Sequence, residues 1–125
     1  MAQAILLGFG FRQSATLDSF EDAFAQTQMT QSCDGIAVPE DKVAHAGLQA
    51  FAQKKGLEIF GVSQAVIAAV TTPSQSLIIR QKRQTGSVAE AAAFALLQQP
   101  ASFMVTRCIS QDRKAVCAIA KGELL

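Results

Sequence analysis

The chain has 125 residues, half of them hydrophobic and 17% charged, a composition that excludes an intrinsically disordered protein. Its formal net charge is only +1, and it contains neither Trp nor Tyr, so neither a basic field nor stacking side chains indicate a nucleic-acid partner. The length predicts a single domain over residues 1–125 with a core of its own.

The cysteines Cys33, Cys108 and Cys117 are odd in number and lack a Cys-x-x-Cys spacing. We therefore expect no disulfide framework, no metal site and no cofactor, and a reducing cytoplasm as the natural setting. The first segment, MAQAILLGFGF, lacks the basic residues of a signal peptide and is too short to span a bilayer, so no membrane partner is predicted. Cys108 and Cys117 are interpreted as small core residues of a hairpin, with an accidental cross-strand pair as the alternative.

Residues 3–9 are apolar and predict a first strand, which Gly8, Phe9 and Gly10 are expected to end. A helix follows, capped by Ser14 or Thr16, whose apolar positions recur at helical spacing: Leu17, Phe20 and Phe24.

Residues 35–38 predict a second short strand, and Pro39 and Glu40 are expected to open a second helix. The apolar positions of that helix are Ala44, Leu48, Phe51 and Ala52. The Lys-Lys-Gly sequence at residues 54–56 is typical of a helix end, and residues 57–60 predict a third strand.

Ser63 is expected to cap a short helix that reaches about Ala69, and residues 71–84 predict a loop followed by a strand or an irregular arm. Ser87 and Glu90 have the spacing of a capping box and predict a helix from about 87 to 98. Residues 102–109 and 114–120 then predict a β-hairpin that turns at residues 111–113.

This alternation of strands and helices predicts an α/β fold with three layers, α/β/α. We expect about five strands in a mixed, mainly parallel sheet that includes the C-terminal hairpin. Ligands of such sheets bind beyond the carboxyl ends of the strands. Three segments are candidates for that rim: Gly8–Arg12, Pro39–Lys42 and Thr85–Ser87.

Individual motifs indicate little chemistry by themselves. GFGFRQS at residues 8–14 has half of a dinucleotide-binding pattern, but Gln13 replaces the third glycine and no acidic residue ends the second strand, so we interpret it as a strand–helix turn. Arg12 in this turn either binds a carboxylate or only solvates the turn. His45 is interpreted as structural, and Glu40 and Asp41 as favourable charges at a helix start.

The Thr85–Ser87 corner has two interpretations. It is either an ordinary capped helix start or an anion site, since helix N-termini present unpaired N–H groups and three basic residues precede this one: Arg80, Lys82 and Arg83. These residues alone favour the capped start.

Four segments carry a family resemblance: LLGFGFR at 6–12, EDKVAHAGLQAFAQKKGLEI at 40–59, TGSVAEAAA at 85–93 and KAVCAIA at 114–120. In this order and spacing they resemble the cobalamin-biosynthesis family that comprises the stand-alone CobE proteins and the C-terminal domain of CbiG. The resemblance spans nearly the whole chain, and its most specific part is SVAEAAA preceded by Thr-Gly.

The family pattern G-x-G-C/F-R falls on Gly8, Gly10, Phe11 and Arg12, and its helix-opening lysine falls on Lys42. Ala44 and His45 stand where acidic residues are common in the family. Arg107 stands near a position where lysine is frequent.

The resemblance implies a role in building the corrin ring of vitamin B12, as a stand-alone CobE-like protein. Precorrins carry many carboxylates around a large apolar macrocycle, which suits a rim of N–H groups and cationic side chains. The expected ligand-binding residues are Gly8, Gly10, Phe11, Arg12, Lys42, Thr85, Gly86, Ser87 and Arg107. With the resemblance included, the anion-site interpretation of Thr85–Ser87 is favoured.

Three functions follow as hypotheses. The first is binding of a polycarboxylate precorrin or other corrinoid intermediate, as a carrier or as an accessory to an enzyme. The second, implied by the two-part CbiG proteins, is hydrolysis of a (cobalt-)precorrin lactone with acetaldehyde release, for which the candidate bases are Glu40, Asp41, His45 and Glu90. The third is a protein-interaction module for pathway enzymes.

Overall fold

The computed structural model describes residues 3–69, 85–98 and 101–125. The loop and arm predicted at 71–84, which include Arg80, Lys82 and Arg83, lie outside these ranges. Its sheet has five strands in the order β3-β2-β1-β5-β4. Strands β1 (Ala4–Phe11), β2 (Gly35–Pro39) and β3 (Ile59–Val62) are parallel to one another. Strand β5 (Ala115–Gly122) is antiparallel to both β1 and β4 (Ser102–Ile109), so the predicted mixed, mainly parallel sheet with a C-terminal hairpin is confirmed.

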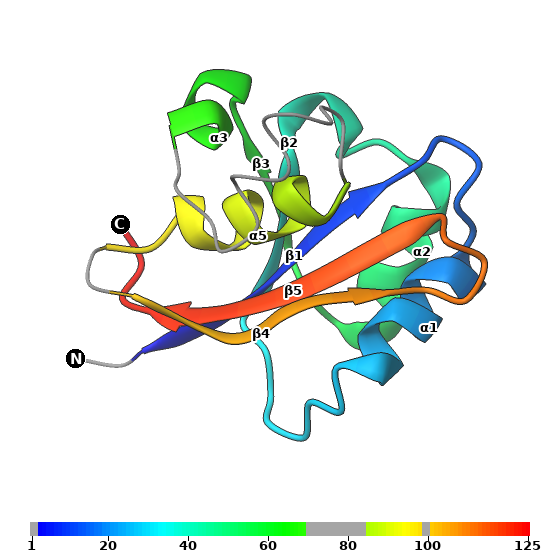
Figure 1. The fold of residues 1–125 in the computed structure, drawn as a ribbon, viewed down its shortest axis with the longest axis horizontal. Helices are drawn as coiled ribbons and strands as arrows, with labels where there is room; N and C mark the ends of the chain where they lie inside the picture. Colours follow the sequence, from blue (N-terminus) through cyan, green and yellow to red (C-terminus); the bar gives the residue numbers. More distant parts are fainter. Residues whose placement is uncertain (1–2, 70–84, 99–100) are drawn as a thin grey trace.

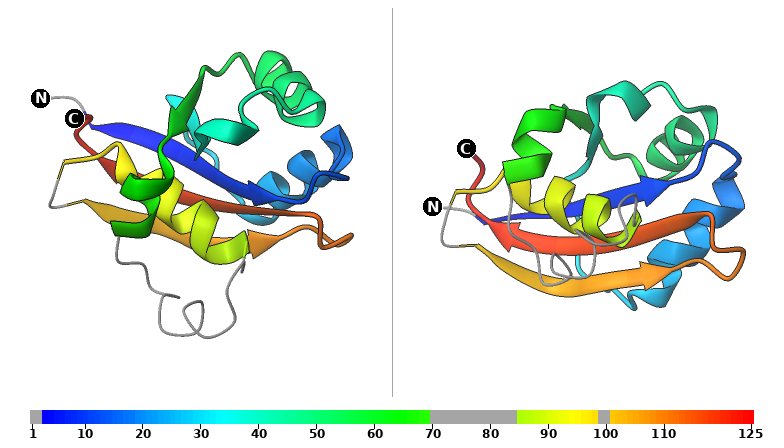
Figure 2. Two further views of the ribbon diagram at one scale, coloured as in Figure 1. Left: turned by 90° about the horizontal axis from the view of Figure 1, so that it is seen from above. Right: turned by 45° about the horizontal axis from the view of Figure 1, so that its top comes forward.

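The helices cover both faces of the sheet (Figures 1 and 2). Helices α1 (Leu17–Gln26) and α2 (Ala46–Lys55) lie on one face, and α3 (Gln64–Ala69) and α5 (Thr85–Ala95) lie on the other. This is the predicted α/β/α arrangement. No helix in the described ranges has the length and apolar character that crossing a membrane requires.

Strand β1 runs through the centre of the sheet and sends alternate side chains to the two faces. Ile5, Leu7 and Phe9 belong to the core under α1 and α2, whereas Ala4 and Leu6 pack on the α5 side. The prediction that Gly8–Gly10 would end this strand is wrong, because β1 pairs with β5 in unbroken register as far as Phe11.

Aromatic side chains form the core under α1 and α2. The Phe9 ring meets the rings of Phe20 and Phe51 edge to face, with centroids 5.2 and 5.3 Å apart. All three rings and Leu48 are fully buried, as the helical spacing predicted for Phe20, Leu48 and Phe51, whereas Ala44 is exposed and is not part of this core. Edge-to-face pairs add to the stabilisation that burial of the rings provides.

Small residues form the opposite core, between α5 and the sheet. Ala89, Ala92 and Ala93 of α5 are fully buried there. A Cβ atom on Gly8 would overlap the carbonyl oxygen of Ala89 and lie 2.7 Å from the amide nitrogen of Ala93. Gly8 is therefore required because a helix backbone passes directly over it, and not because the chain turns there.

Several element boundaries differ from the sequence-based expectations. Helix α5 begins at Thr85, so Ser87 lies within its first turn and the predicted capping box with Ser87 as the cap is wrong. Pro39 leads into a short 3₁₀ turn, η1 (Glu40–Lys42), and α2 begins only at Ala46, six residues after Glu40. Helix α2 does end as predicted, with Gly56 in the left-handed conformation at φ 69°.

The carboxylates of Asp112 and Asp22 form hydrogen bonds that link the tip of the β4–β5 hairpin to α1. Ser19 Oγ donates to Asp112 Oδ2 at 2.6 Å, and the backbone N–H of Gln111 donates to the Asp22 carboxylate. Hydrogen bonds from the hydroxyls of Ser110 and Ser19 and from the backbone of Lys114 lower the pKa of Asp112 below its ordinary value of 3.8. The charged form of Asp112 thus stabilises the folded state.

We predict that Gly8→Ala lowers the free energy of unfolding by about 3 kcal/mol or more, because α5 must move away from the sheet. Gly56→Ala is the matched control: its added Cβ meets nothing within 4 Å, so only the left-handed backbone is strained, at about 1 kcal/mol. Urea unfolding of both variants measures the difference. Equal losses would contradict the close approach of α5.

We predict that Asp112 contributes stability that is fully present above its unfolded-state pKa and is lost as the pH falls through the lower pKa of the folded state. Asp112→Asn should therefore be less stable than the wild type near neutral pH, and the two should converge as the pH falls below 3.8. Urea unfolding as a function of pH measures this. In a Ser19→Ala background the difference should be smaller, and a difference that is independent of pH would refute the role of the charge.

Candidate functional site

A pocket of about 140 Å³ lies where the carboxyl ends of β1, β2 and β3 meet the first turns of α5. Parallel strands bring their carboxyl ends to one edge of a sheet, which is where ligands of α/β proteins bind. The described residues that line the pocket come from β1, β2, η1, α3 and α5: Gly10, Phe11, Pro39, Lys42, Gln64, Ile67 and Val88.

The walls of the pocket are mainly apolar, from Pro39, Ile67 and Val88, and its polar side chains are Lys42 and Gln64. Lys42 is half-buried and forms no ion pair with any residue that the structure describes. An ammonium group at an apolar wall attracts anions more strongly than one in bulk water, because the local dielectric constant is lower. The pocket therefore suits a ligand with an apolar stem and a negatively charged end.

Two acidic residues precede Lys42 in η1. Glu40 and Asp41 are both exposed to solvent and neither lines the pocket. Water and salt screen exposed charges, so these carboxylates reduce the positive potential at Lys42 without neutralising it.

The structure brings together part of the predicted ligand-binding set. Gly10, Phe11 and Lys42 line the pocket, and Thr85–Ser87 form the first turn of α5, directly before the lining residue Val88. The helix start and the lysine are thus neighbours across one small pocket.

Three other predicted residues lie away from the pocket. Gly8 is buried beneath α5. Arg12 is exposed in the turn after β1, where its backbone N–H donates to the carbonyl of Lys114 at 2.9 Å. Arg107 is exposed on edge strand β4, within a register shift between Val105 and Cys108 and separated from β1 by β5.

Sequence reasoning had placed Pro39 in a candidate rim segment but missed Gln64, Ile67 and Val88 as lining residues. Gln64 follows Ser63, whose Oγ accepts from the backbone N–H of Val66 at 3.2 Å and so caps α3 as predicted. The signal for Gln64 was therefore present in the sequence: a capped helix after the third parallel strand places its first residue at the same rim.

His45 connects the turn after β1 to α2. Its Nδ1 accepts from the backbone N–H of Leu48 at 3.3 Å, which caps α2, and its Nε2 lies 2.9 Å from the carbonyl oxygen of Gln13. Because Nδ1 accepts, the ring proton is on Nε2 and is donated to Gln13. Both ring nitrogens are engaged, in agreement with the structural role predicted for this residue.

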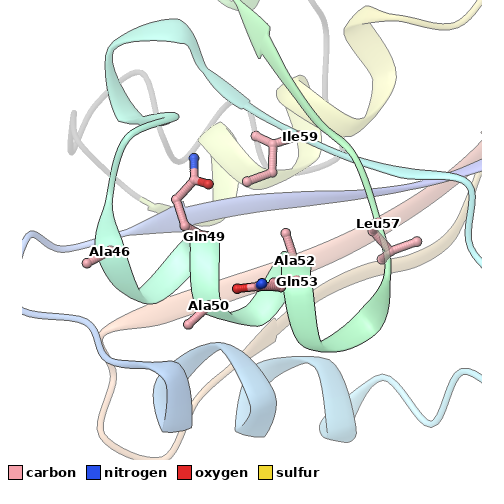
Figure 3. A pocket seen from close by; sticks show the side chains of 7 residues that line it. All are labelled: Ala46, Gln49, Ala50, Ala52, Gln53, Leu57 and Ile59. Carbon is pink, nitrogen blue, oxygen red and sulfur yellow. The ribbon is translucent and has the colours of Figure 1, made fainter.

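A larger hollow, of about 770 Å³, lies between α2 and the segment that follows it (Figure 3). Gln49 and Gln53 come from α2, and Leu57 and Ile59 come from the chain leading into and along β3. The remaining lining residues are alanines, so the described lining has no charged side chain. This hollow does not match a polycarboxylate ligand.

The three cysteines are free thiols that differ in burial. Cys108 and Cys117 are opposite each other in the β4–β5 register, and both thiols are free, as is that of Cys33. Cys117 is fully buried, and its burial raises the pKa of its thiol well above 9.0. This confirms the interpretation as a small core residue for Cys117, whereas Cys108 is only half-buried.

Comparisons with known proteins give a consistent result. The family model described as "Cobalamin synthesis G C-terminus" matches residues 5–120. The crystal structure of CobE, a protein from the cobalamin (vitamin B12) biosynthetic pathway, is similar with a TM-score of 0.74 at 21% identity, covering 100% of this chain and 94% of that one. The cobalamin biosynthesis protein chiG from Agrobacterium tumefaciens is similar with a TM-score of 0.68 at 26% identity, covering 94% and 97% of the two chains. No curated protein sequence matches.

We predict that His45→Ala lowers the free energy of unfolding by about 1 kcal/mol or slightly more, since both the cap of α2 and the link to Gln13 are lost. His45→Asn should recover most of this loss, because an Asn side chain can accept from the same Leu48 N–H group. Urea unfolding of the two variants provides the comparison. If Asn proves as destabilising as Ala, the cap is not what His45 contributes.

Proposed function

The chain belongs to the cobalamin synthesis G C-terminus family, and from this premise we propose that it binds a polycarboxylate precorrin or related corrinoid intermediate. It does so as a carrier or as an accessory to an enzyme of corrin-ring assembly. The observation that carries the proposal is the pocket at the carboxyl edge of the parallel strands, which Lys42, without an ion pair among the described residues, lines together with the first turns of α5.

The chemistry of the ligand class matches the chemistry of this edge. A precorrin combines an apolar macrocycle with many acetate and propionate groups, so it requires apolar contact and several anion contacts together. Pro39, Ile67 and Val88 supply apolar surface, and Lys42 supplies a charge-assisted hydrogen bond. The first turn of α5 adds backbone N–H groups and the positive end of the helix dipole.

The predicted ligand-binding residues that do not line the pocket have other roles in this proposal. Arg12 and Arg107 are exposed and would bind peripheral carboxylates of a ring that extends beyond the pocket. Gly8 acts indirectly, because it allows α5 to lie close to β1 and so positions the helix start.

A lactone hydrolase is less well supported by the geometry. Such an enzyme needs a base that can activate water beside the bound lactone. Both nitrogens of His45 are already engaged, Glu40 and Asp41 are exposed outside the pocket lining, and Glu90 is fully buried in α5. Acetaldehyde release from a lactone intermediate would nevertheless establish this activity.

The hollow between α2 and β3 favours a different second function, an interaction with pathway enzymes. Its uncharged lining of Ala, Gln, Leu and Ile suits a protein surface better than a carboxylate-rich ring. A protein with this function alone would retain no corrinoid, which separates the two possibilities.

We predict that the purified protein, mixed with hydrogenobyrinic acid and desalted, retains a corrinoid whose absorption is visible in the protein peak. The chain contains no chromophore of its own in that range. Lys42→Glu should reduce the retained absorption about tenfold or more, because it replaces an anion contact with a repulsive charge. Arg12→Glu should reduce it less.

Lys54→Glu is the control for these charge reversals. Lys54 lies on α2, where it forms an exposed ion pair with Glu21 at 2.7 Å and does not line the pocket. Its reversal makes the same change in net charge and should leave retention unchanged. A colourless wild-type peak, or equal losses for Lys42→Glu and Lys54→Glu, would reject the proposed site.

A further inference from the structure

We propose that the pocket holds the end of one carboxylate arm of the ligand, and that Lys42 and Gln64 select a free acid over its amide. The macrocycle then lies outside, against the rim. This inference rests on the proposed function and adds a specificity that neither the family nor the fold assigns.

The size of the pocket decides which part of a ligand enters. Sites that enclose a drug-sized molecule have volumes of about 300–1,000 Å³. The pocket here has about 140 Å³, which is too small for a macrocycle but sufficient for a short chain of a few methylene groups that ends in a carboxylate. Only an arm can therefore be enclosed, and it must enter end-on.

The wall of the pocket suits the stem of such an arm. Pro39, Ile67 and Val88 are apolar, and contact with them removes methylene surface from water. Gly10 contributes no side chain to the wall, so the arm can approach the backbone of β1 closely.

The polar side chains of the pocket suit the carboxylate at the end of such an arm. Lys42 has only donors, and the Gln64 amide has both a donor and an acceptor end. A carboxylate has only acceptors, so it can accept from both side chains at once. An arm that ends in an amide can accept only through its carbonyl oxygen and lacks the charge that pairs with Lys42, so it binds these side chains more weakly.

The position of Gln64 is set by its surroundings and not by the ligand. The Ser63 hydroxyl caps α3 through the backbone N–H of Val66, and Val62 at the end of β3 is buried. Gln64 follows directly as the first residue of α3. Its backbone is thus fixed at the mouth of the pocket before any ligand binds.

The test uses small probes and the whole protein. Butyrate and butyramide have nearly the same shape and differ in charge, and their binding can be followed by amide chemical shifts in an isotope-labelled sample. We expect butyrate to shift the signals of Lys42 and Gln64, and butyramide to bind about tenfold more weakly. Gln64 is exposed, and its replacement in Gln64→Glu should abolish the preference for the acid.

A pair of Val→Phe variants then tests enclosure of the arm. Val88→Phe fills the pocket, whereas Val66→Phe makes the same change on the exposed surface of α3, outside the lining. Retention of hydrogenobyrinic acid should fall about tenfold in Val88→Phe and in Gln64→Glu, and remain at the wild-type level in Val66→Phe.

The outcomes separate this inference from the proposed function. If the wild type retains the corrinoid and both Val88→Phe and Gln64→Glu retain it equally well, the enclosed arm is rejected and the proposed function stands. If the wild type retains none but prefers butyrate to butyramide at Lys42 and Gln64, the proposed function fails and acid selection by the pocket stands. Equal binding of the two probes, or binding of neither, overturns acid selection.

Discussion

The close approach of α5 to β1 is the constraint on which the rest of the structure depends. Gly8 has no side chain, and the facing residues of α5 are alanines, so the helix backbone lies almost directly on the central strand. This contact fixes both the height and the direction of α5. Its first turn consequently arrives at the carboxyl ends of β1 and β2, where the pocket is found. A bulkier residue at Gly8 would alter the pocket from a position that does not line it.

Sequence periodicity was informative where one face of an element is buried. The apolar spacing of Phe20, Leu48 and Phe51 identified the side chains that fill one core, and residues 102–109 were predicted with their observed bounds. The interpretation of Gly8–Gly10 as a turn failed for a physical reason. A glycine needed for contact with a distant helix has the same appearance in a sequence as a glycine needed for a turn, and only the partner, Ala89, distinguishes them.

The candidate site was predictable only in part, for a related reason. Gly10, Phe11 and Lys42 follow strands that sequence patterns had identified, so the rule for parallel sheets placed them at one rim. Ile67 and Val88 are apolar residues of helices, and nothing in their local sequence distinguishes a pocket wall from a core position. The role of His45 as the cap of α2 could not be predicted either. It depends on the 3₁₀ turn η1, which no local sequence pattern indicates.

The strand order has a consequence for the growing chain on the ribosome. Strand β1 is synthesised first, yet one of its two neighbours is β5, and the pair is in register from Ala4 with Gly122 to Phe11 with Ala115. One edge of an apolar central strand therefore stays unpaired until β5 has been made. Unpaired apolar strand edges are what chaperones protect and what aggregation exploits. The sheet can accordingly be completed only after β5 has left the ribosome, in a step that joins two segments far apart in the described sequence.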